Sequence, residues 1–251
     1  MELSGRTALV TGGTSDIGAA IVRALARHGA DVVFQYHRNA ARAQAVVDEV
    51  IGMGRRSRAI PADLTLPEDA RRVASEAGML APLDILVNNA GTPIRRVHWT
   101  DLDAPFLDLV FNLNFRAPLY LCQQVAPAMV RRGKGVVINI LSTAANLGGT
   151  DTVYAYSSAK GALSTLTRAL ARSLAPQGVR VLAISPGTID TGFQRGPLTS
   201  PEQLERLRQG IPLGRIGRPE EIGEVVAFMA TDAASFIIGE TIHVNGGLYM
   251  T

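Results

Sequence analysis

Short apolar runs alternate with longer amphipathic stretches along the whole chain. The apolar runs read as strands and cover residues 7–10, 32–36, 57–60, 83–87, 135–141, 180–184 and 241–244. Stretches with helical periodicity lie between them, for example at 17–28 and 40–53. Several runs are apolar without alternation, as expected of strands buried on both faces. The pattern therefore predicts an α/β protein, with a parallel sheet covered by helices on both faces.

One region departs from this alternation. Residues 187–219 are rich in glycine and proline, with a short helical pattern only at 201–209. A loop of this length in a compact domain is usually functional, so we expect a lid over a site. No repeat or linker interrupts the chain, and 251 residues suit a single domain.

Composition and charge narrow the class of protein. The chain is 47% hydrophobic and 19% charged, which is ordinary for a soluble globular protein. The net charge of +3 is mild, and Arg55, Arg56 and Arg58 form no basic stripe, so we expect no nucleic-acid partner. The apolar runs are too short to span a bilayer, and the amino end reads as a strand rather than a signal peptide. These features predict a cytoplasmic protein without membrane contact.

Cysteine and histidine usage indicates neither a disulfide nor a metal site. Cys122 is the single cysteine, and its apolar neighbours predict a buried structural thiol. The four histidines show no ligand-type spacing, so we expect no bound metal.

A tyrosine and a lysine share one helix face. Lys160 is one of two lysines beside 23 arginines, and it follows Tyr156 by four residues. An ammonium there can stabilise a phenolate and lower the pKa of the phenol from about 10. Tyr154 has no such partner, because position 158 is serine. The pair predicts a general acid or base, although Lys160 could also be a solvated cation on an amphipathic helix.

A glycine-rich turn, Thr11-Gly-Gly-Thr-Ser-Asp-Ile-Gly18, follows the first predicted strand and precedes a helix. Glycines in this place let the backbone approach a pyrophosphate, whose charge lies against the helix amino end. A plain tight turn would have the same composition. The strand–turn–helix context favours a dinucleotide site.

These motifs, in this order, resemble the short-chain dehydrogenase/reductase family, whose turn reads Thr-Gly-x-x-x-Gly-x-Gly. The resemblance implies a single NAD(P)-binding domain over residues 1–251, with a Rossmann-type doubly wound sheet of strand order 3-2-1-4-5-6-7. The middle glycine of the family turn is Asp16 here. A side chain and charge at that place should crowd or repel a diphosphate. Asp is also a favoured N-cap, however, and could point along the helix away from the phosphates.

The end of the second predicted strand bears on the choice of cofactor. NAD enzymes carry a carboxylate there that accepts hydrogen bonds from the ribose, whereas this chain has Tyr36-His37-Arg38. Arg38 could bind a 2′-phosphate through two parallel hydrogen bonds, with His37 secondary, or it could be a solvated residue. We therefore predict NADP(H), with NAD less favoured. Many NADP-using relatives also carry a basic residue in the glycine turn, where this chain has Ser15.

The resemblance extends to the remaining contacts of the cofactor. It implies an adenine contact at Asp63, a loop at 88–91 after the fourth strand, and a carboxamide contact at 186–191. The cofactor-binding residues implied in this way are Gly12, Thr14, Ser15, Asp16, Ile17, Gly18, Tyr36, His37, Arg38, Asp63, Leu64, Asn89, Ala90, Gly91, Tyr156, Lys160, Pro186, Gly187, Ile189 and Thr191.

Carbonyl reduction requires a hydride, a proton donor and a group that polarises the oxygen. Tyr156 can supply the proton. The resemblance implies that Lys160 also holds the ribose, that Ser142 orients the carbonyl and that Asn114 keeps a water in a proton relay. Asn112 competes with Asn114 for the last role.

The substrate is harder to predict. The ending Val-Asn-Gly-Gly-Leu-Tyr-Met resembles that of 3-oxoacyl-(acyl carrier protein) reductases, so reduction of a 3-oxoacyl thioester, free or carrier-bound, is the first prediction. The basic residue that such enzymes often use for docking is Gln177 here, although Arg131 and Arg132 could contribute. A sugar or polyol dehydrogenase and a broad carbonyl reductase are alternatives. A nucleotide sensor without activity is remote, because Tyr156 and Lys160 are both kept. The family usually forms a homotetramer, which we expect here.

Overall fold

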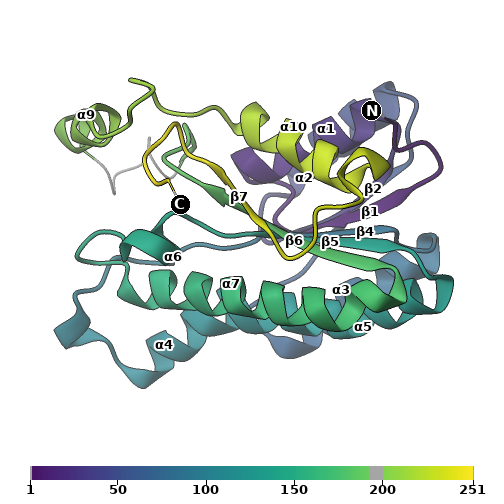
Figure 1. The fold of residues 1–251 in the computed structure, drawn as a ribbon, viewed down its shortest axis with the longest axis horizontal. Helices are drawn as coiled ribbons and strands as arrows, with labels where there is room; N and C mark the ends of the chain where they lie inside the picture. Colours follow the sequence, from purple (N-terminus) through teal and green to yellow (C-terminus); the bar gives the residue numbers. More distant parts are fainter. Residues whose placement is uncertain (1, 193–199, 251) are drawn as a thin grey trace.

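The computed structural model describes residues 2–192 and 200–250. A seven-stranded parallel sheet of order β3-β2-β1-β4-β5-β6-β7 forms its centre (Figure 1), which confirms the predicted sheet and strand order. The observed bounds differ from the predicted ones by at most two residues. The strands are β1 (Thr7–Val10), β2 (Asp31–Tyr36), β3 (Ser57–Pro61), β4 (Ile85–Asn88), β5 (Gly135–Ile140), β6 (Val179–Pro186) and β7 (Thr241–Val244).

Helices cover both faces of this sheet (Figure 1). One face carries α1 (Asp16–Arg27), α2 (Ala40–Gly52) and α10 (Pro219–Ala230). The other carries α3 (Pro67–Leu80), α4 (Ala104–Phe111), α5 (Ala117–Arg132) and α7 (Tyr154–Leu174). Shorter elements are α6 (Ala144–Leu147), α9 (Pro201–Gln209), the π-helical turn η2 (Asn112–Arg116) and the 3-10 turns η1 (Trp99–Asp101), η3 (Ala175–Gln177) and η4 (Asp232–Ala234).

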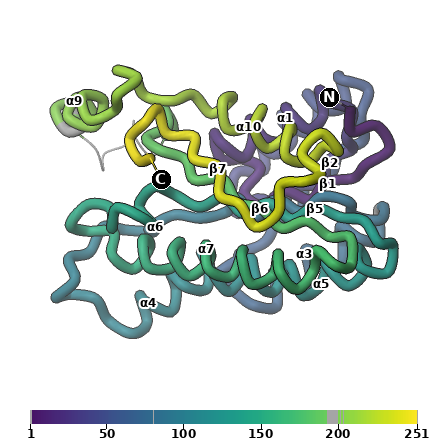
Figure 2. The backbone as a smooth tube through the Cα atoms, in the orientation of Figure 1, coloured from purple at the N-terminus to yellow at the C-terminus, as the bar shows by residue number. Residues whose placement is uncertain are grey.

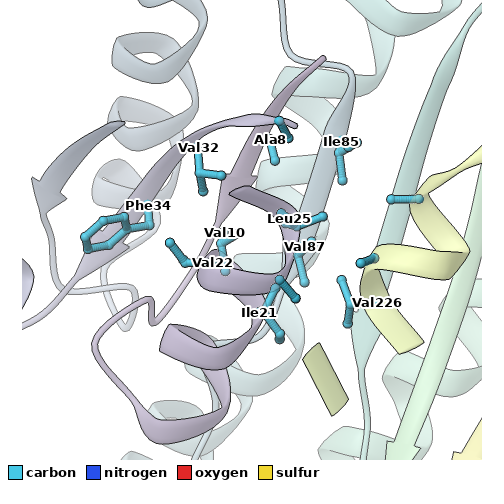
Figure 3. Packing of buried hydrophobic residues seen from close by; sticks show 14 of the residues in the cluster. Ala8, Val10, Ile21, Val22, Leu25, Val32, Phe34, Ile85, Val87 and Val226 are labelled. Carbon is cyan, nitrogen blue, oxygen red and sulfur yellow. The ribbon is translucent and has the colours of Figure 1, made fainter. Parts of the chain in front are cut away.

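Each face of the sheet has its own buried core. In β1, Val10 belongs to the cluster beneath α1 and α10, whereas its neighbour Leu9 belongs to the cluster on the opposite face. Figure 3 shows the first cluster, in which Ile21 of α1 and Val226 of α10 lie over the strands. Alternate residues of a strand point to opposite faces, and both faces are buried, so the strands are apolar without alternation. Cys122 is buried in the second cluster.

The predicted lid follows β6. Residues 193–199 of this segment lie outside the described residues. Helix α9 has the predicted bounds, and the backbone N–H of Leu213 beyond it donates to the carbonyl of Gly246 at 3.0 Å. The carboxyl-terminal segment therefore lies beside the chain that leaves α9, at one end of the molecule (Figure 2). Among the described helices, none combines the length and apolar character that a membrane span needs.

Candidate active site

A cavity of about 1080 Å³ opens at the carboxyl ends of the central strands. Ligands of doubly wound sheets bind at this edge, where the strand order reverses between β1 and β4. Residues after β1, β2 and β3 line one part of the cavity, which we call the nucleotide half. Residues of the 92–96 segment and of the chain around α6 line the part that we call the substrate half. Ser142 and Tyr156 lie between them.

A buried glutamine holds the glycine-rich turn in place. The side chain of Gln35 in β2 accepts from the backbone N–H of Gly12 at 2.9 Å and donates to the carbonyl of Ala62 at 2.8 Å. Gly12 itself has a φ of 65°, a conformation that favours glycine. The sequence analysis missed Gln35, although a polar residue inside an otherwise apolar buried strand is a signal for such a role.

Two residues predicted to bind the cofactor do not line the cavity. Gly18 serves close packing, because a β-carbon there would lie 2.0 Å from the carbonyl oxygen of Gly12. Tyr36 packs against the core cluster beneath α1 and α10. Tyr36 was predicted to bind the cofactor because it lies at the end of β2. Alternate side chains of a strand point to opposite faces, however, and that of Tyr36 points to the core.

Asp16 does not cap α1, as the sequence analysis suggested it could. Ser15 is the N-cap, and its hydroxyl accepts from the N–H of Gly18 at 3.0 Å. The Asp16 carboxylate turns instead toward α2 and the chain after β6. It accepts from Arg42 at 2.6 Å and from the backbone N–H of Gly192 at 2.6 Å. The negative charge in the glycine turn is therefore paired with a cation.

Polar side chains also gather around the end of β2. Arg38 is exposed and lines the cavity, and Nε2 of His37 lies 3.5 Å from the carboxylate of Asp63. Partial burial of Asp63 opposes its ionisation, but hydrogen bonds from Thr65 hold the pKa of this carboxyl below its usual value. The nucleotide half thus offers both a carboxylate and a cation to a bound nucleoside.

Ser142, Tyr156 and Lys160 meet beneath the cavity. Ser142 follows the end of β5, and the other two residues lie on the first turns of α7. The Ser142 hydroxyl faces the Tyr156 phenol closely enough to act against the rise of its pKa. The Lys160 ammonium donates to the carbonyl of Ile140 at 2.7 Å and lies 5.7 Å from the centre of the Tyr156 ring. The structure therefore brings three of the four predicted catalytic residues together.

The electrostatics of this group differ from the prediction. Burial raises the pKa of Tyr156 to about 12, against the opposing hydrogen bond from Ser142. Burial also lowers the pKa of Lys160 to about 7. The prediction considered only the attraction between phenolate and ammonium. It left out the cost of removing both groups from water, which disfavours each charged form taken alone.

Asn114 is buried beside the same group and does not line the cavity. It lies in the π-helical turn η2 between α4 and α5, a type of turn that is frequent at functional sites. Its amide donates to the carbonyls of Thr92 and Val110, while Oδ1 has no hydrogen-bond partner among the described residues. A β-carbon on Gly91 would lie 2.7 Å from Oδ1 and 2.8 Å from the Lys160 Nζ, so both atoms face one small space. Asn112 instead accepts a hydrogen bond from Arg116.

A strained turn shapes the substrate half. Ile94 has a φ of 67°, and the N–H of Arg95 donates across it to the carbonyl of Pro93 at 2.7 Å, which makes a rare form of γ-turn. The turn places Arg95 over the ring of Phe106, 4.4 Å from its centre, and leaves Ile94 and Arg96 lining the cavity. The sequence analysis gave no role to this segment.

Arg96 is the one charged side chain among the described residues of the substrate half. Its guanidinium donates to the Thr150 hydroxyl at 3.2 Å. The other described side chains there are mainly apolar and include Pro93, Ile94, Leu109, Leu113, Leu147, Val153, Leu207 and Leu248. The aromatic side chains of Tyr154 and His98 pack against each other outside this lining.

The doubly wound sheet, the glycine-rich turn and the Ser–Tyr–Lys group that lines the cavity together define a nucleotide-dependent oxidoreductase. The chain belongs to the short-chain dehydrogenase/reductase family: a family model described as enoyl-(acyl carrier protein) reductase matches residues 12–249.

Known proteins similar to this chain differ in their substrates. L-rhamnose 1-dehydrogenase (NAD(P)(+)) of Sphingomonas sp. is 32% identical over 99% of this chain and 98% of its own length. A 3-oxoacyl-(acyl-carrier-protein) reductase of Staphylococcus epidermidis is 33% identical over 98% of this chain and 99% of its own length. The crystal structure of a putative NAD(P)-dependent gluconate 5-dehydrogenase from Beutenbergia cavernae, with bound NADP, has a TM-score of 0.92 and 36% identity over 98% of both chains.

Proposed function

We propose that this chain is an NADP(H)-dependent oxidoreductase that interconverts a carbonyl and a secondary alcohol. The observation that carries the proposal is the group formed by Ser142, Tyr156 and Lys160, which lines the cavity between its two halves. NADP(H), when bound, supplies or accepts the hydride. The residues of the chain then have to orient the oxygen of the substrate and move one proton.

Tyr156 is the proton donor for carbonyl reduction. Its raised pKa keeps the phenol protonated at neutral pH, and Ser142 can donate a second hydrogen bond to the same carbonyl oxygen. Lys160 and the Oδ1 of Asn114 face one space beside Gly91, where a water could pass a proton toward the phenol. In the reverse reaction the phenolate would accept the proton of the alcohol, which requires the ammonium beside it.

NADP(H) is the proposed cofactor because of the end of β2. Arg38 lines the nucleotide half there, and no acidic residue occupies positions 36–38. The glycine-rich turn leaves room for the diphosphate of the cofactor. Gly12 allows the tight turn through its positive φ, and Gly18 lets α1 pack closely against the turn. The bound NADP of the gluconate 5-dehydrogenase structure supports the same choice.

For the substrate, we propose a small polyol or hydroxy acid that carries a carboxylate. Arg96 places a positive charge in a mainly apolar pocket, and a guanidinium recognises a carboxylate through paired hydrogen bonds. The name of the gluconate 5-dehydrogenase supports an acidic polyol. A 3-oxoacyl thioester remains the second candidate, favoured by the apolar side chains that surround Arg96 and by the similar 3-oxoacyl reductase.

The arginines considered for carrier docking lie on the opposite edge of the sheet. Arg132 is 3.6 Å from Asp84, the residue before β4, whereas the cavity is at the carboxyl ends of the strands. A carrier held by Arg131 and Arg132 would therefore sit across the sheet from the cavity of the same subunit. This geometry favours a free substrate over a carrier-bound one.

A substrate panel tests the proposal. Initial rates with NADP(H) are compared for carboxylated polyols, neutral sugars and acetoacetyl thioesters. We expect Arg96→Met to lower kcat/KM for the carboxylated substrates by about a hundredfold, which corresponds to the loss of one charge-assisted hydrogen bond. The kcat/KM for neutral substrates should change little. Arg95→Met is the matched control, because Arg95 packs on Phe106 outside the cavity. A wild type that turns over only thioesters would contradict the acidic substrate and favour the second candidate.

A further inference from the structure

We propose that Arg42 is a second cation for the 2′-phosphate of NADP(H), and that Asp16 positions its guanidinium. The proposal rests on the proposed use of NADP(H) and concerns how this chain recognises that phosphate. Arg42 belongs to α2 and lines the nucleotide half of the cavity together with Arg38. Neither the glycine turn nor the end of β2 shows this role in the sequence, because Arg42 lies four residues beyond Arg38 on the next helix.

Hydrogen bonds fix both the backbone and the guanidinium of Arg42. Its backbone N–H donates to the side chain of Asn39, the N-cap of α2, at 2.9 Å. Its guanidinium donates to the carboxylate of Asp16 at 2.6 Å. An arginine of α2 thus brings a positive charge to the glycine turn, where Ser15 stands in place of a basic residue.

Asp16 is suited to positioning because it is itself held. Its second carboxylate oxygen accepts from the backbone N–H of Gly192 at 2.6 Å, and its side chain is 20% exposed, against 43% for Arg42. A guanidinium has five N–H donors, so the bond to a carboxylate leaves others for a phosphate. Arg38 and Arg42 thus bring two guanidinium groups to the nucleotide half, where Asp16 contacts Arg42 and Asp63 lies beside His37.

A second ion pair between the same helices offers a matched comparison. Arg23 of α1 donates to Glu49 of α2 at 3.1 Å, and neither residue lines the cavity. Both pairs connect α1 with α2, but only the Asp16–Arg42 pair faces the nucleotide half. Loss of either pair removes a contact between the helices, whereas only loss of Arg42 removes a ligand.

Binding to the purified protein without cofactor tests the role of Arg42. Calorimetry gives the Kd of NADPH, NADH and adenosine 2′,5′-bisphosphate for the wild type, Arg42→Gln and Arg23→Gln. We expect Arg42→Gln to weaken NADPH and the bisphosphate about tenfold or more, and NADH less than about twofold. Arg23→Gln should leave all three constants unchanged. Equal weakening of NADPH and NADH, or the same effect from Arg23→Gln, would overturn the proposal.

A double-mutant cycle tests the role of Asp16. Asp16→Gly restores the glycine of the family turn, and without the carboxylate the Arg42 guanidinium is no longer oriented. The penalty of Arg42→Gln on NADPH binding should therefore fall from about tenfold to less than about threefold in this background. Equal penalties in both backgrounds would show that Asp16 does not position Arg42.

The wild-type constants separate this proposal from the proposed cofactor. If the wild type binds NADPH and NADH equally, the preference for NADP(H) fails, whatever Arg42 does. If the wild type prefers NADPH and Arg42→Gln keeps that preference, only the role of Arg42 fails.

Discussion

The two halves of the cavity are built in different ways. The nucleotide half lies on the carboxyl ends of β1, β2 and β3 and on the first turn of α1, and buried hydrogen bonds such as those of Gln35 hold it. The substrate half depends more on connecting segments, among them a turn with strained backbone at Ile94, although α4, α6 and α9 also contribute apolar side chains. Regular elements thus position the groups that any dinucleotide needs, while loops provide the side chains that select a substrate.

The charges follow the same division. The nucleotide half contains acidic and basic side chains in contact: Asp16 pairs with Arg42, and the Asp63 carboxylate lies beside the His37 ring. The substrate half has Arg96 in mainly apolar surroundings among its described residues. Such a pocket selects among substrates mainly through the charge of Arg96, whereas the nucleotide half can contact the cofactor through several polar side chains. Variants should therefore separate cofactor binding from substrate selection.

Loss of the Tyr156 hydroxyl should have the largest effect and should leave the nucleotide half intact. We expect Tyr156→Phe to lower kcat by 10²-fold or more, as removal of a general acid does. The Kd of NADPH should stay within about twofold of the wild-type value, because the phenol lies between the halves. Steady-state rates and calorimetry measure the two quantities.

Tyr154→Phe is the control for this variant. Tyr154 lies in the same turn of α7 but packs against His98, so its hydroxyl should not affect turnover. Wild-type turnover in Tyr156→Phe, or an equal loss in Tyr154→Phe, would contradict the assignment.

The difference between the halves also explains what the sequence could predict. The strand bounds follow from local apolar runs, whereas the strand order was implied by the resemblance to the family. Tyr156 with Lys160 follows from helical spacing. The Asp16–Arg42 pair joins residues 26 positions apart, and it depends on how α1 packs beside α2. The π-helical turn at Asn114 and the γ-turn at Ile94 have no local signal either. Tertiary packing imposes both, so no reading of short patterns could have found them.

Lys160 should make the stability of the protein depend on pH. Burial lowers its pKa from the usual 10.5 to about 7, so between these values the unfolded chain binds a proton that the folded chain does not. The free energy of unfolding should therefore rise with pH above 7, by at most about 1.4 kcal/mol per pH unit. Urea unfolding at pH 7.0, 7.75 and 8.5 measures the slope, which should be absent in Lys160→Met.

The upper limit of pH 8.5 keeps ionisation of the Cys122 thiol from contributing to the measured slope. Burial raises the pKa of that thiol to about 12, so its contribution has the opposite sign and begins near the usual thiol pKa of 9. If Lys160→Met keeps the wild-type slope, the ammonium is not the group whose burial matters, and the electrostatic account of the site is wrong.

The smallest effect is expected at the strained turn of the substrate half. A residue other than glycine in the left-handed region costs about 1–2 kcal/mol, and part of this is offset by the greater freedom of glycine in the unfolded chain. We expect Ile94→Gly to raise the free energy of unfolding by about 1 kcal/mol, measured by urea denaturation. It should also raise KM for the substrate, because the side chain lines the cavity, and leave the Kd of NADPH unchanged.

Ile94→Ala separates strain from contact, because it removes the same side-chain contact but keeps the strained conformation. It should raise KM as Ile94→Gly does without any gain in stability. If alanine and glycine stabilise the protein equally, the backbone at position 94 stores no strain. If neither variant changes KM, the turn does not shape the substrate half, and the contrast between the two halves loses its main support.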